Sequence, residues 1–263
     1  MTPRGGRWAD LRVRVTSAVV MIAVGAVATW EGGWFFVSAT VVAFAAMTWE
    51  LAGMTARDDG VRLTLAGSAA LCLLASLRLS PPLAVAVLLV PALGFYLTER
   101  GDRVVLTLYQ AALMLAGAGF MLLRHQGALV FLWLIVVVVV SDIMGYFAGR
   151  LIGGPKFWPQ ISPKKTWAGT VAGWVGATLV GWGFVAAGAA GWGLLIFSPL
   201  VAFAGQMGDI VESWIKRRAG VKDASGLIPG HGGVLDRFDA LMGAVMAVLV
   251  IAQVIPLPFP LAG

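Results

Sequence analysis

Residues 127–149 read GALVFLWLIVVVVVSDIMGYFAG, an apolar run long enough to cross the hydrocarbon core of a bilayer as one helix. The rest of the sequence shares this character, because 59% of its 263 residues are apolar and only 12% are charged. A soluble domain usually carries about 25% charged residues. A chain this apolar has too few polar side chains to cover a surface that faces water, whereas lipid can face apolar side chains. We therefore expect an integral membrane protein.

Eight further apolar segments resemble this run in length and in their polar flanks, which gives nine expected membrane spans. The predicted fold class is an all-α polytopic membrane protein. Residues 1–28, with four arginines followed by an apolar run, also resemble a signal peptide. The many later spans favour a first helix that is retained. The expected spans cover about residues 15–30, 34–54, 62–79, 82–98, 104–123, 127–149, 167–188, 191–215 and 234–255.

The distribution of positive charge sets the expected orientation of these spans. With the N-terminus in the cytoplasm, 17 of the 19 Lys and Arg residues fall on the cytoplasmic side, and only Arg78 and Arg124 fall outside. The positive-inside rule describes such a bias. We therefore expect a multi-pass protein of the cell's inner (plasma) membrane with a cytoplasmic N-terminus. Its net charge of +6 then serves topology and contact with anionic lipid or phosphate, and we expect no nucleic-acid partner.

The two halves of the chain differ in their loops. Residues 1–125 form N-terminal transmembrane helices with short loops. Residues 126–263 contain two longer cytoplasmic segments, 150–166 and 216–233, which are rich in Lys, Gly and Pro. Function usually resides in loops held by a rigid scaffold. We therefore expect a C-terminal catalytic transmembrane region with its active site at the cytoplasmic face.

The segment GDIVESWIKR at residues 208–217 carries the densest set of ionisable groups near a span. On a helix, Asp209, Glu212 and Lys216 fall on one face because they are three or four residues apart. Carboxylates near a membrane core normally face a polar cavity and have a function. The alternative is a carboxylate pair at a helix end, balanced by Lys216 and Arg217 at the membrane interface.

A glycine-rich loop, PGHGG at residues 229–233, leads directly into a last span that opens with Asp236 and Asp239. Backbone N–H groups of such a loop can approach phosphate closely, although a plain turn has the same composition. Carboxylates are also favoured at a helix N-terminus for electrostatic reasons alone. Together with Asp209 and Glu212 on the preceding span, they can equally hold Mg²⁺, which prefers oxygen ligands and substrate phosphates.

Asp142 places a carboxylate at membrane depth in the 127–149 span, where it is a candidate wall or ligand of a polar site. Gly145 and Gly149 follow it at a spacing that permits close helix packing. The basic loop after this span ends in SPKKT at residues 162–166. Its hydroxyl and ammonium groups suit a polyphosphate, although basic loops also set topology.

These segments together resemble the phosphatidate cytidylyltransferase family. The residues SWIKR at 213–217, Lys222-Asp223, and HGGVLDRFD at 231–239 are similar to the signature of that family in type and spacing. The similarity is strong over about residues 140–245. The first half is similar mainly in hydropathy, with Trp49-Glu50 in an expected place. One difference is Ala168, at a position where the family usually has Glu.

The resemblance implies that CTP and phosphatidic acid give CDP-diacylglycerol and pyrophosphate, with Mg²⁺ as cofactor and a second cation left open. Membrane lipid is the further expected partner, and the glycine spacings leave a homodimer open. We assign catalysis to Asp209, Asp236, Lys216, Arg217 and His231, of which His231 bonds a phosphate or shapes the loop. The expected metal ligands are Asp209, Asp236, Asp239 and Glu212, and the expected substrate-binding residues are Ser162, Lys164, Lys165, Thr166, Lys222 and Arg237.

Two other functions use the same residue types. A CTP-dependent polyprenol or phytol kinase also needs metal-binding carboxylates and basic loops. An ion-coupled transporter would use buried acids as an ion path. It predicts inverted repeats and broken helices in both halves, whereas the acids here concentrate in the second half, which disfavours it.

Overall fold

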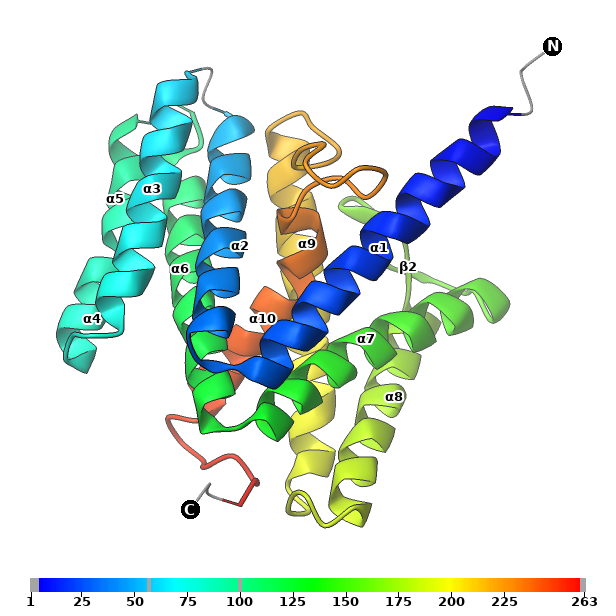
Figure 1. The fold of residues 1–263 in the computed structure, drawn as a ribbon. Coiled ribbons are helices and arrows are strands. Elements are labelled where there is room, and N and C mark those ends of the chain that lie inside the picture. The colour runs from blue at the N-terminus through cyan, green and yellow to red at the C-terminus, as the bar shows by residue number, and fades with distance from the viewer. Residues whose placement is uncertain (1–4, 56–57, 99–100, 261–263) are drawn as a thin grey trace. The chain divides into compact units, whose positions relative to one another are not determined.

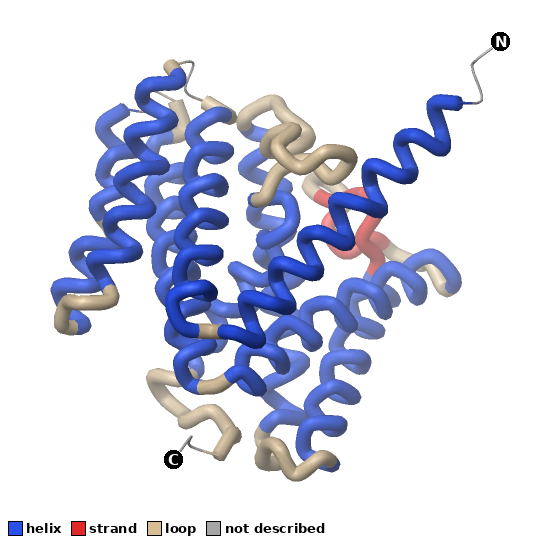
Figure 2. Tube along the Cα trace, viewed as in Figure 1, coloured by secondary structure: helices blue, strands red, loops and turns tan. Residues whose placement is uncertain are grey.

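The computed structural model describes residues 5–55, 58–98 and 101–260, and their side chains from residue 12 onward. These residues form ten helices and one short β-hairpin (Figure 1, Figure 2). In chain order the elements are α1 (Gly5–Glu31), α2 (Gly33–Gly53), α3 (Asp59–Ser76), α4 (Pro81–Leu88), α5 (Val90–Thr98), α6 (Arg103–Gln126), α7 (Ala128–Leu151), β1 (Lys156–Trp158), β2 (Ser162–Thr166), α8 (Trp167–Ala186), α9 (Leu194–Arg218) and α10 (Leu235–Ile251).

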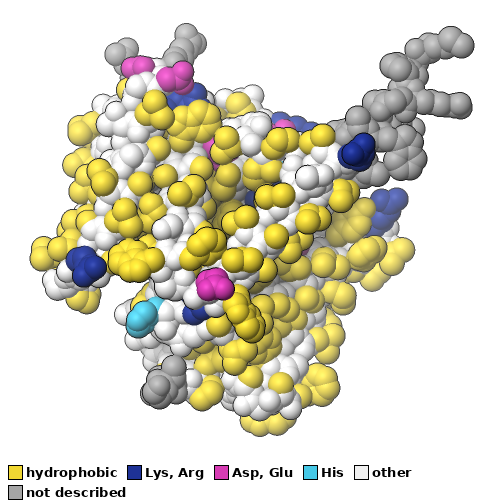
Figure 3. Space-filling model, in the orientation of Figure 1, with side chains coloured by type: hydrophobic (Ala, Val, Ile, Leu, Met, Phe, Trp, Pro, Cys, Tyr) yellow, Lys and Arg dark blue, Asp and Glu magenta, His cyan; other side chains and the backbone are white. Residues whose placement is uncertain are grey.

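The prediction of an all-α polytopic membrane protein is confirmed. Within the described residues, eight helical stretches are long and apolar enough to cross a membrane, with α4 and α5 counted as one stretch, Pro81–Thr98. The ninth expected span corresponds to α10, which at 17 residues is shorter than the other eight. Figure 3 shows hydrophobic side chains over much of the visible helix surface, as expected where helices face lipid.

The chain alternates between two compact units. Unit 1 comprises residues 1–114 and 219–237, and unit 2 comprises residues 115–218 and 238–263. The expected halves divide the chain once, between residues 125 and 126, whereas the observed units interleave. Helix α10 consequently begins in unit 1 and continues in unit 2.

Unit 1 is built around α2, which packs on α3, while α4 and α5 pack beside α3. Phe44 and Leu51 of α2 are fully buried. The amide nitrogen of Gln110 on α6 donates a hydrogen bond of 3.0 Å to the hydroxyl of Thr48. Both side chains are fully buried, so this bond offsets part of the desolvation of the two polar groups.

In unit 2, α8 packs between α7 and α9 (Figure 1). A Cβ atom added to Gly145 of α7 would come within 3.2 Å of the carbonyl oxygen of Gly169 on α8. The two backbones are therefore nearly in contact, as the glycine spacing on α7 predicts. The indole nitrogen of Trp133 on α7 donates a 2.9 Å hydrogen bond to the hydroxyl of Ser198 on α9.

The segment that connects α7 to α8, predicted as a basic loop suited to a polyphosphate, contains a β-hairpin. Strands β1 and β2 are antiparallel, with Lys156 opposite Thr166 and Trp158 opposite Ser162. Thr166 ends the hairpin and caps α8, because its hydroxyl accepts a 3.2 Å hydrogen bond from the Gly169 backbone nitrogen. This cap therefore ties the end of β2 to the first turn of α8.

Candidate active site

Three carboxylates meet in unit 2, on the last turns of α9 and the first turns of α10. One oxygen each of Asp209, Glu212 and Asp239 lies within 4.8 Å of the others. The side chain of Glu212 is fully buried, and the other two are half-buried. The structure thus brings together three of the four carboxylates expected at a metal site.

A glycine-lined crossing of α9 and α10 accounts for this convergence. A Cβ atom on Gly208 would collide with the carbonyl oxygen of Asp239 and come within 3.1 Å of the backbone nitrogen of Gly243. A Cβ atom on Gly243 would collide with the carbonyl oxygen of Ala204. The two backbones touch directly, which carries Asp239 next to Asp209. The role of Gly243 was not predicted from the sequence, although Gly243 lies one turn after Asp239 in an apolar helix.

Lysines accompany two of the carboxylates. The Lys165 ammonium lies 2.6 Å from Asp209 Oδ2 and donates a 3.2 Å hydrogen bond to the carbonyl oxygen of Gln206. Lys216 lies 2.7 Å from Glu212, one turn away on α9. The Ser213 hydroxyl donates a 3.3 Å hydrogen bond to Asp209 Oδ1. The predicted face of Asp209, Glu212 and Lys216 is therefore present on α9, and Ser213 lies on it beside Asp209.

The three carboxylates fit a small divalent cation. Mg²⁺ holds oxygen ligands at about 2.0–2.1 Å, so two ligands on opposite sides of the ion lie roughly 4.2 Å apart. One oxygen each of Asp209, Glu212 and Asp239 lies within 4.8 Å of the others, which is close to that spacing. All three donors are oxygens, the type that Mg²⁺ prefers.

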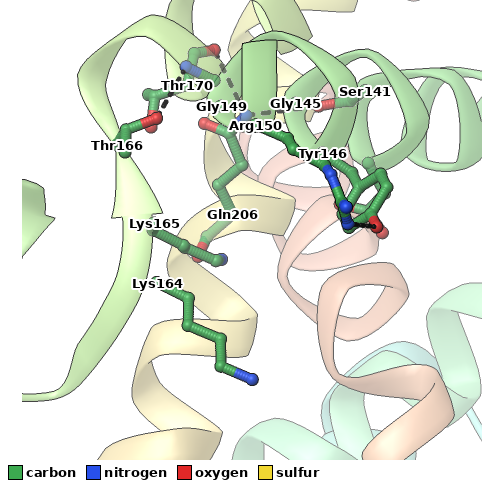
Figure 4. A pocket seen from close by; sticks show the side chains of 12 residues that line it. Ser141, Gly145, Tyr146, Gly149, Arg150, Lys164, Lys165, Thr166, Thr170 and Gln206 are labelled. Atoms are coloured by element: carbon green, nitrogen blue, oxygen red, sulfur yellow. Dashed lines mark hydrogen bonds between the residues drawn. The ribbon is translucent and has the colours of Figure 1, made fainter. Parts of the chain in front are cut away.

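Beside this group, unit 2 contains an open cavity of about 540 Å³ (Figure 4). Helix α7 contributes Asp142, Tyr146 and Arg150 to its wall. Lys164 and Lys165 reach into it from β2. The Arg150 guanidinium donates a 3.1 Å hydrogen bond to the Tyr146 hydroxyl. Three predicted substrate-binding residues, Lys164, Lys165 and Thr166, therefore line one cavity together with Asp142.

Gln206, which was not predicted from the sequence, lines this cavity, and its carbonyl oxygen accepts the hydrogen bond from Lys165. Its buried amide donates hydrogen bonds of 3.3 Å to the Ser141 hydroxyl and the Thr170 carbonyl, and accepts one of 3.1 Å from the Trp174 indole nitrogen. These contacts join α9 to α7 and α8. The available signal was its position three residues before Asp209, on the same face of α9.

In unit 1, the segment 219–234, called here the glycine loop, is held by a buried carboxylate from a distant helix. Glu50 of α2 is fully buried and accepts hydrogen bonds from the Ser225 hydroxyl at 2.6 Å and from the backbone nitrogens of Val234 and Leu235 at 2.9 and 2.7 Å. A Cβ atom on Gly233 would come within 2.7 Å of this carboxylate. Glu50 therefore fixes the end of the loop and the start of α10 at one point. Its role had no local signal in the sequence.

Asp236 also organises the glycine loop. Its Oδ2 accepts hydrogen bonds from the backbone nitrogens of Ala224 and Gly233, at 3.0 and 2.8 Å. Gly230 and Gly232 have φ values of +77° and +83°, which side chains with a Cβ rarely adopt. These contacts show that Asp236 has a structural role in the loop. Its expected role as a metal ligand stays a prediction.

The other predicted site residues lie outside the carboxylate group and the cavity lining. His231 is half-buried in the glycine loop, and its backbone nitrogen donates a 2.9 Å hydrogen bond to Ile228. Lys222 and Arg237 are exposed residues of unit 1, and Arg217 is an exposed residue of unit 2. Ser162 is half-buried in β2, outside the lining of the cavity. Their assigned functions stay predictions.

The sequence is similar to one family of known proteins. The family model described as the cytidylyltransferase family matches residues 12–255. Over 115 residues the chain is 47% identical to the phosphatidate cytidylyltransferase of Brucella abortus. The matched segment covers 43% of this chain and 42% of that protein. The chain is 46% identical over 132 residues to the protein of the same name from Staphylococcus saprophyticus, covering 48% of this chain and 51% of that one. For the Helicobacter pylori protein of that name the identity is 43% over 133 residues, covering 48% and 49%. The chain thus spans about half the length of the curated relatives it matches.

Proposed function

The chain belongs to the cytidylyltransferase family, and from this we propose that it transfers the cytidylyl group of CTP to phosphatidic acid, giving CDP-diacylglycerol and pyrophosphate for phospholipid synthesis. The observation that carries the proposal is the group of Asp209, Glu212 and Asp239 with Lys165 and Lys216 against it. The relatives named phosphatidate cytidylyltransferase support the choice of substrates. We further propose an inner-membrane location with a cytoplasmic N-terminus, on the charge distribution given above.

In the proposed reaction, a phosphate oxygen of phosphatidate attacks the α-phosphorus of CTP. The bond from that phosphorus to the oxygen bridging it to the β-phosphate breaks, and this oxygen leaves with the electron pair as part of pyrophosphate. The attacking phosphate is already an anion, so the reaction needs neither a Ser or Cys nucleophile nor a general base. The main barrier is repulsion between two anions, which cationic groups reduce by positioning and charge neutralisation.

We propose Asp209, Glu212 and Asp239 as the residues that hold Mg²⁺. The assignment of Asp236 as a ligand stays a prediction from the sequence. Bound Mg²⁺ supplies charge neutralisation on the triphosphate and on the leaving pyrophosphate. Lys165 and Lys216 each keep an ammonium beside a carboxylate of this group, within reach of a phosphate bound there. Ammonium–phosphate hydrogen bonds are charge-assisted and strong.

Labelled CTP tests the proposal directly. The purified chain in detergent, with phosphatidate and Mg²⁺, is incubated with CTP that carries a radioactive label on the α- or the γ-phosphate in separate reactions. We expect the α label to appear in lipid and the γ label in pyrophosphate, and neither to move when phosphatidate is omitted. A lipid kinase would place the γ label on its acceptor, and a transporter would convert neither. Either of these two results would refute the proposed function.

A further inference from the structure

The cavity of unit 2 runs along a membrane span. Its wall on α7 extends from Ser141 to Arg150, a distance of about 13 Å along the helix at 1.5 Å per residue. Next to this wall, Ile143 and Phe147 are 50% and 56% exposed. Exposed apolar side chains on a membrane span contact lipid. A lipid molecule can therefore lie beside α7 with its polar end in the cavity, while a nucleotide arrives from water.

The charges in the cavity differ from those of the carboxylate group. Among the described residues, the structure pairs Lys165 with Asp209, while Arg150 and Lys164 have no carboxylate partner. Of the residues that line the cavity, only Asp142 is acidic. A metal-bound triphosphate suits a cluster of carboxylates, whereas a phosphate monoester with no metal of its own needs cations directly. Arg150 and Lys164 provide those cations at the end of α7 and on β2.

We propose that this cavity binds the phosphate monoester of the lipid substrate, with Arg150 and Lys164 as the residues that recognise it. The inference rests on the proposed function and adds to it the place of the lipid. Lys165 lines the cavity and lies 2.6 Å from Asp209, so it stands at the boundary between the lipid phosphate and a nucleotide held at the carboxylates. The attacking oxygen and the α-phosphorus then approach each other beside Lys165. Tyr146 accepts a 3.1 Å hydrogen bond from Arg150, which holds the guanidinium at the wall of this cavity.

Separate Michaelis constants for the two substrates test the inference. The purified full chain is assayed in mixed micelles, first with varied mole fractions of dioleoyl phosphatidate and then with varied CTP. In Arg150→Gln and in Lys164→Gln we expect the KM for phosphatidate to rise about tenfold or more, the effect of losing one charge-assisted phosphate contact. We expect the KM for CTP to stay within about twofold of the wild-type value.

Arg103→Gln is the matched control. Arg103 is an exposed arginine at a helix end beside a tyrosine, with its guanidinium 5.0 Å from the Tyr96 ring, but it lies in unit 1 and outside the cavity. Both of its constants should equal those of the wild type. If Arg150→Gln yields no folded protein, Arg150→Lys and Lys164→Gln carry the test. A rise in the KM for CTP alone, or unchanged constants in both cavity variants, would overturn the inference.

A binding measurement without CTP separates the inference from the proposed function. Native mass spectrometry of the purified chain should show retained dioleoyl phosphatidate and not dioleoyl phosphatidylcholine, and less phosphatidate in Arg150→Gln. If wild-type protein made no CDP-diacylglycerol yet retained phosphatidate through Arg150, the lipid site would stand and the proposed reaction would fall. If it made CDP-diacylglycerol but retained phosphatidate equally in Arg150→Gln, the reaction would stand and the lipid site would fall.

Discussion

Both carboxylate oxygens of Asp209 have partners: Oδ2 lies 2.6 Å from the Lys165 ammonium, and Oδ1 accepts a hydrogen bond from the Ser213 hydroxyl. Asparagine has nearly the same shape but carries no charge and only one oxygen. We expect Asp209→Asn to reduce kcat by roughly 10²-fold or more, the loss of a metal contact worth several kcal/mol. Steady-state rates at varied Mg²⁺ measure this. The yield of folded protein should stay close to that of the wild type.

Asp58→Asn is the control for this substitution. Asp58 caps α3 by accepting a 2.9 Å hydrogen bond from the Gly60 backbone nitrogen, and asparagine caps helices about as well as aspartate. Its activity should therefore match the wild type. If Asp209→Asn kept both the wild-type rate and the wild-type Mg²⁺ dependence, the metal assignment would be wrong.

At the scale of elements, the glycine loop depends on one helix that is remote in sequence. Glu50 accepts three hydrogen bonds at the end of the loop and the start of α10. In Glu50→Gln, the amide nitrogen faces donors and cannot accept, so at least one buried donor loses its partner, which costs about 1–3 kcal/mol. We expect the loop to open more often and kcat to fall about tenfold or more. Trypsin cleavage after Lys222, an exposed loop residue, should accelerate in parallel.

Glu31→Gln, at the exposed end of α1, is the matched control for Glu50→Gln and should change neither the rate nor the digestion pattern. Tryptic cleavage at Lys222 as slow in Glu50→Gln as in the wild type would show that the loop does not need this carboxylate. The KM for CTP and kcat should be determined separately, because a general loss of folded protein lowers the apparent kcat and leaves KM unchanged.

Local patterns in the sequence predicted much of the fold and part of the site. Apolar length located the helices, because a membrane span needs only its own side chains and backbone hydrogen bonds. Helical spacing placed Asp209 and Glu212 on one face, and the structure brings the predicted ligand Asp239 beside them through the α9–α10 crossing. The hairpin at residues 156–166 was missed because its strands are short and polar. The role of Glu50 was missed because its partners lie 175 to 185 residues further along the chain.

At the scale of the whole molecule, the two ends of α8 allow a test of the proposed orientation in the membrane. Gln160 precedes this helix and Ala187 follows it, and both side chains are exposed. A helix of 20 residues is about 30 Å long, so its two ends reach opposite sides of the bilayer. In a Cys72→Ser background, we expect a cysteine at position 160 to react only with reagent supplied from the cytoplasm. A cysteine at position 187 should react from outside.

Comparison of the two positions makes the labelling experiment internally controlled, because both cysteines flank the same helix. Labelling of position 160 from outside, with position 187 protected there, would reverse the proposed orientation. Labelling of both positions from one side would mean that α8 does not cross the membrane.

The distance in sequence between Glu50 and the glycine loop also has a consequence for biosynthesis. Glu50 is translated 175 residues before Ser225, which at 5–20 residues per second is an interval of roughly 9 to 35 s. During that interval Glu50 has been made, but the part of the loop that its carboxylate will hold has not yet been synthesised. Asp239 is translated later still than the loop. The three carboxylates can therefore meet only after α10 has been made, so under the proposed function a nascent chain that ends before α10 should not use CTP.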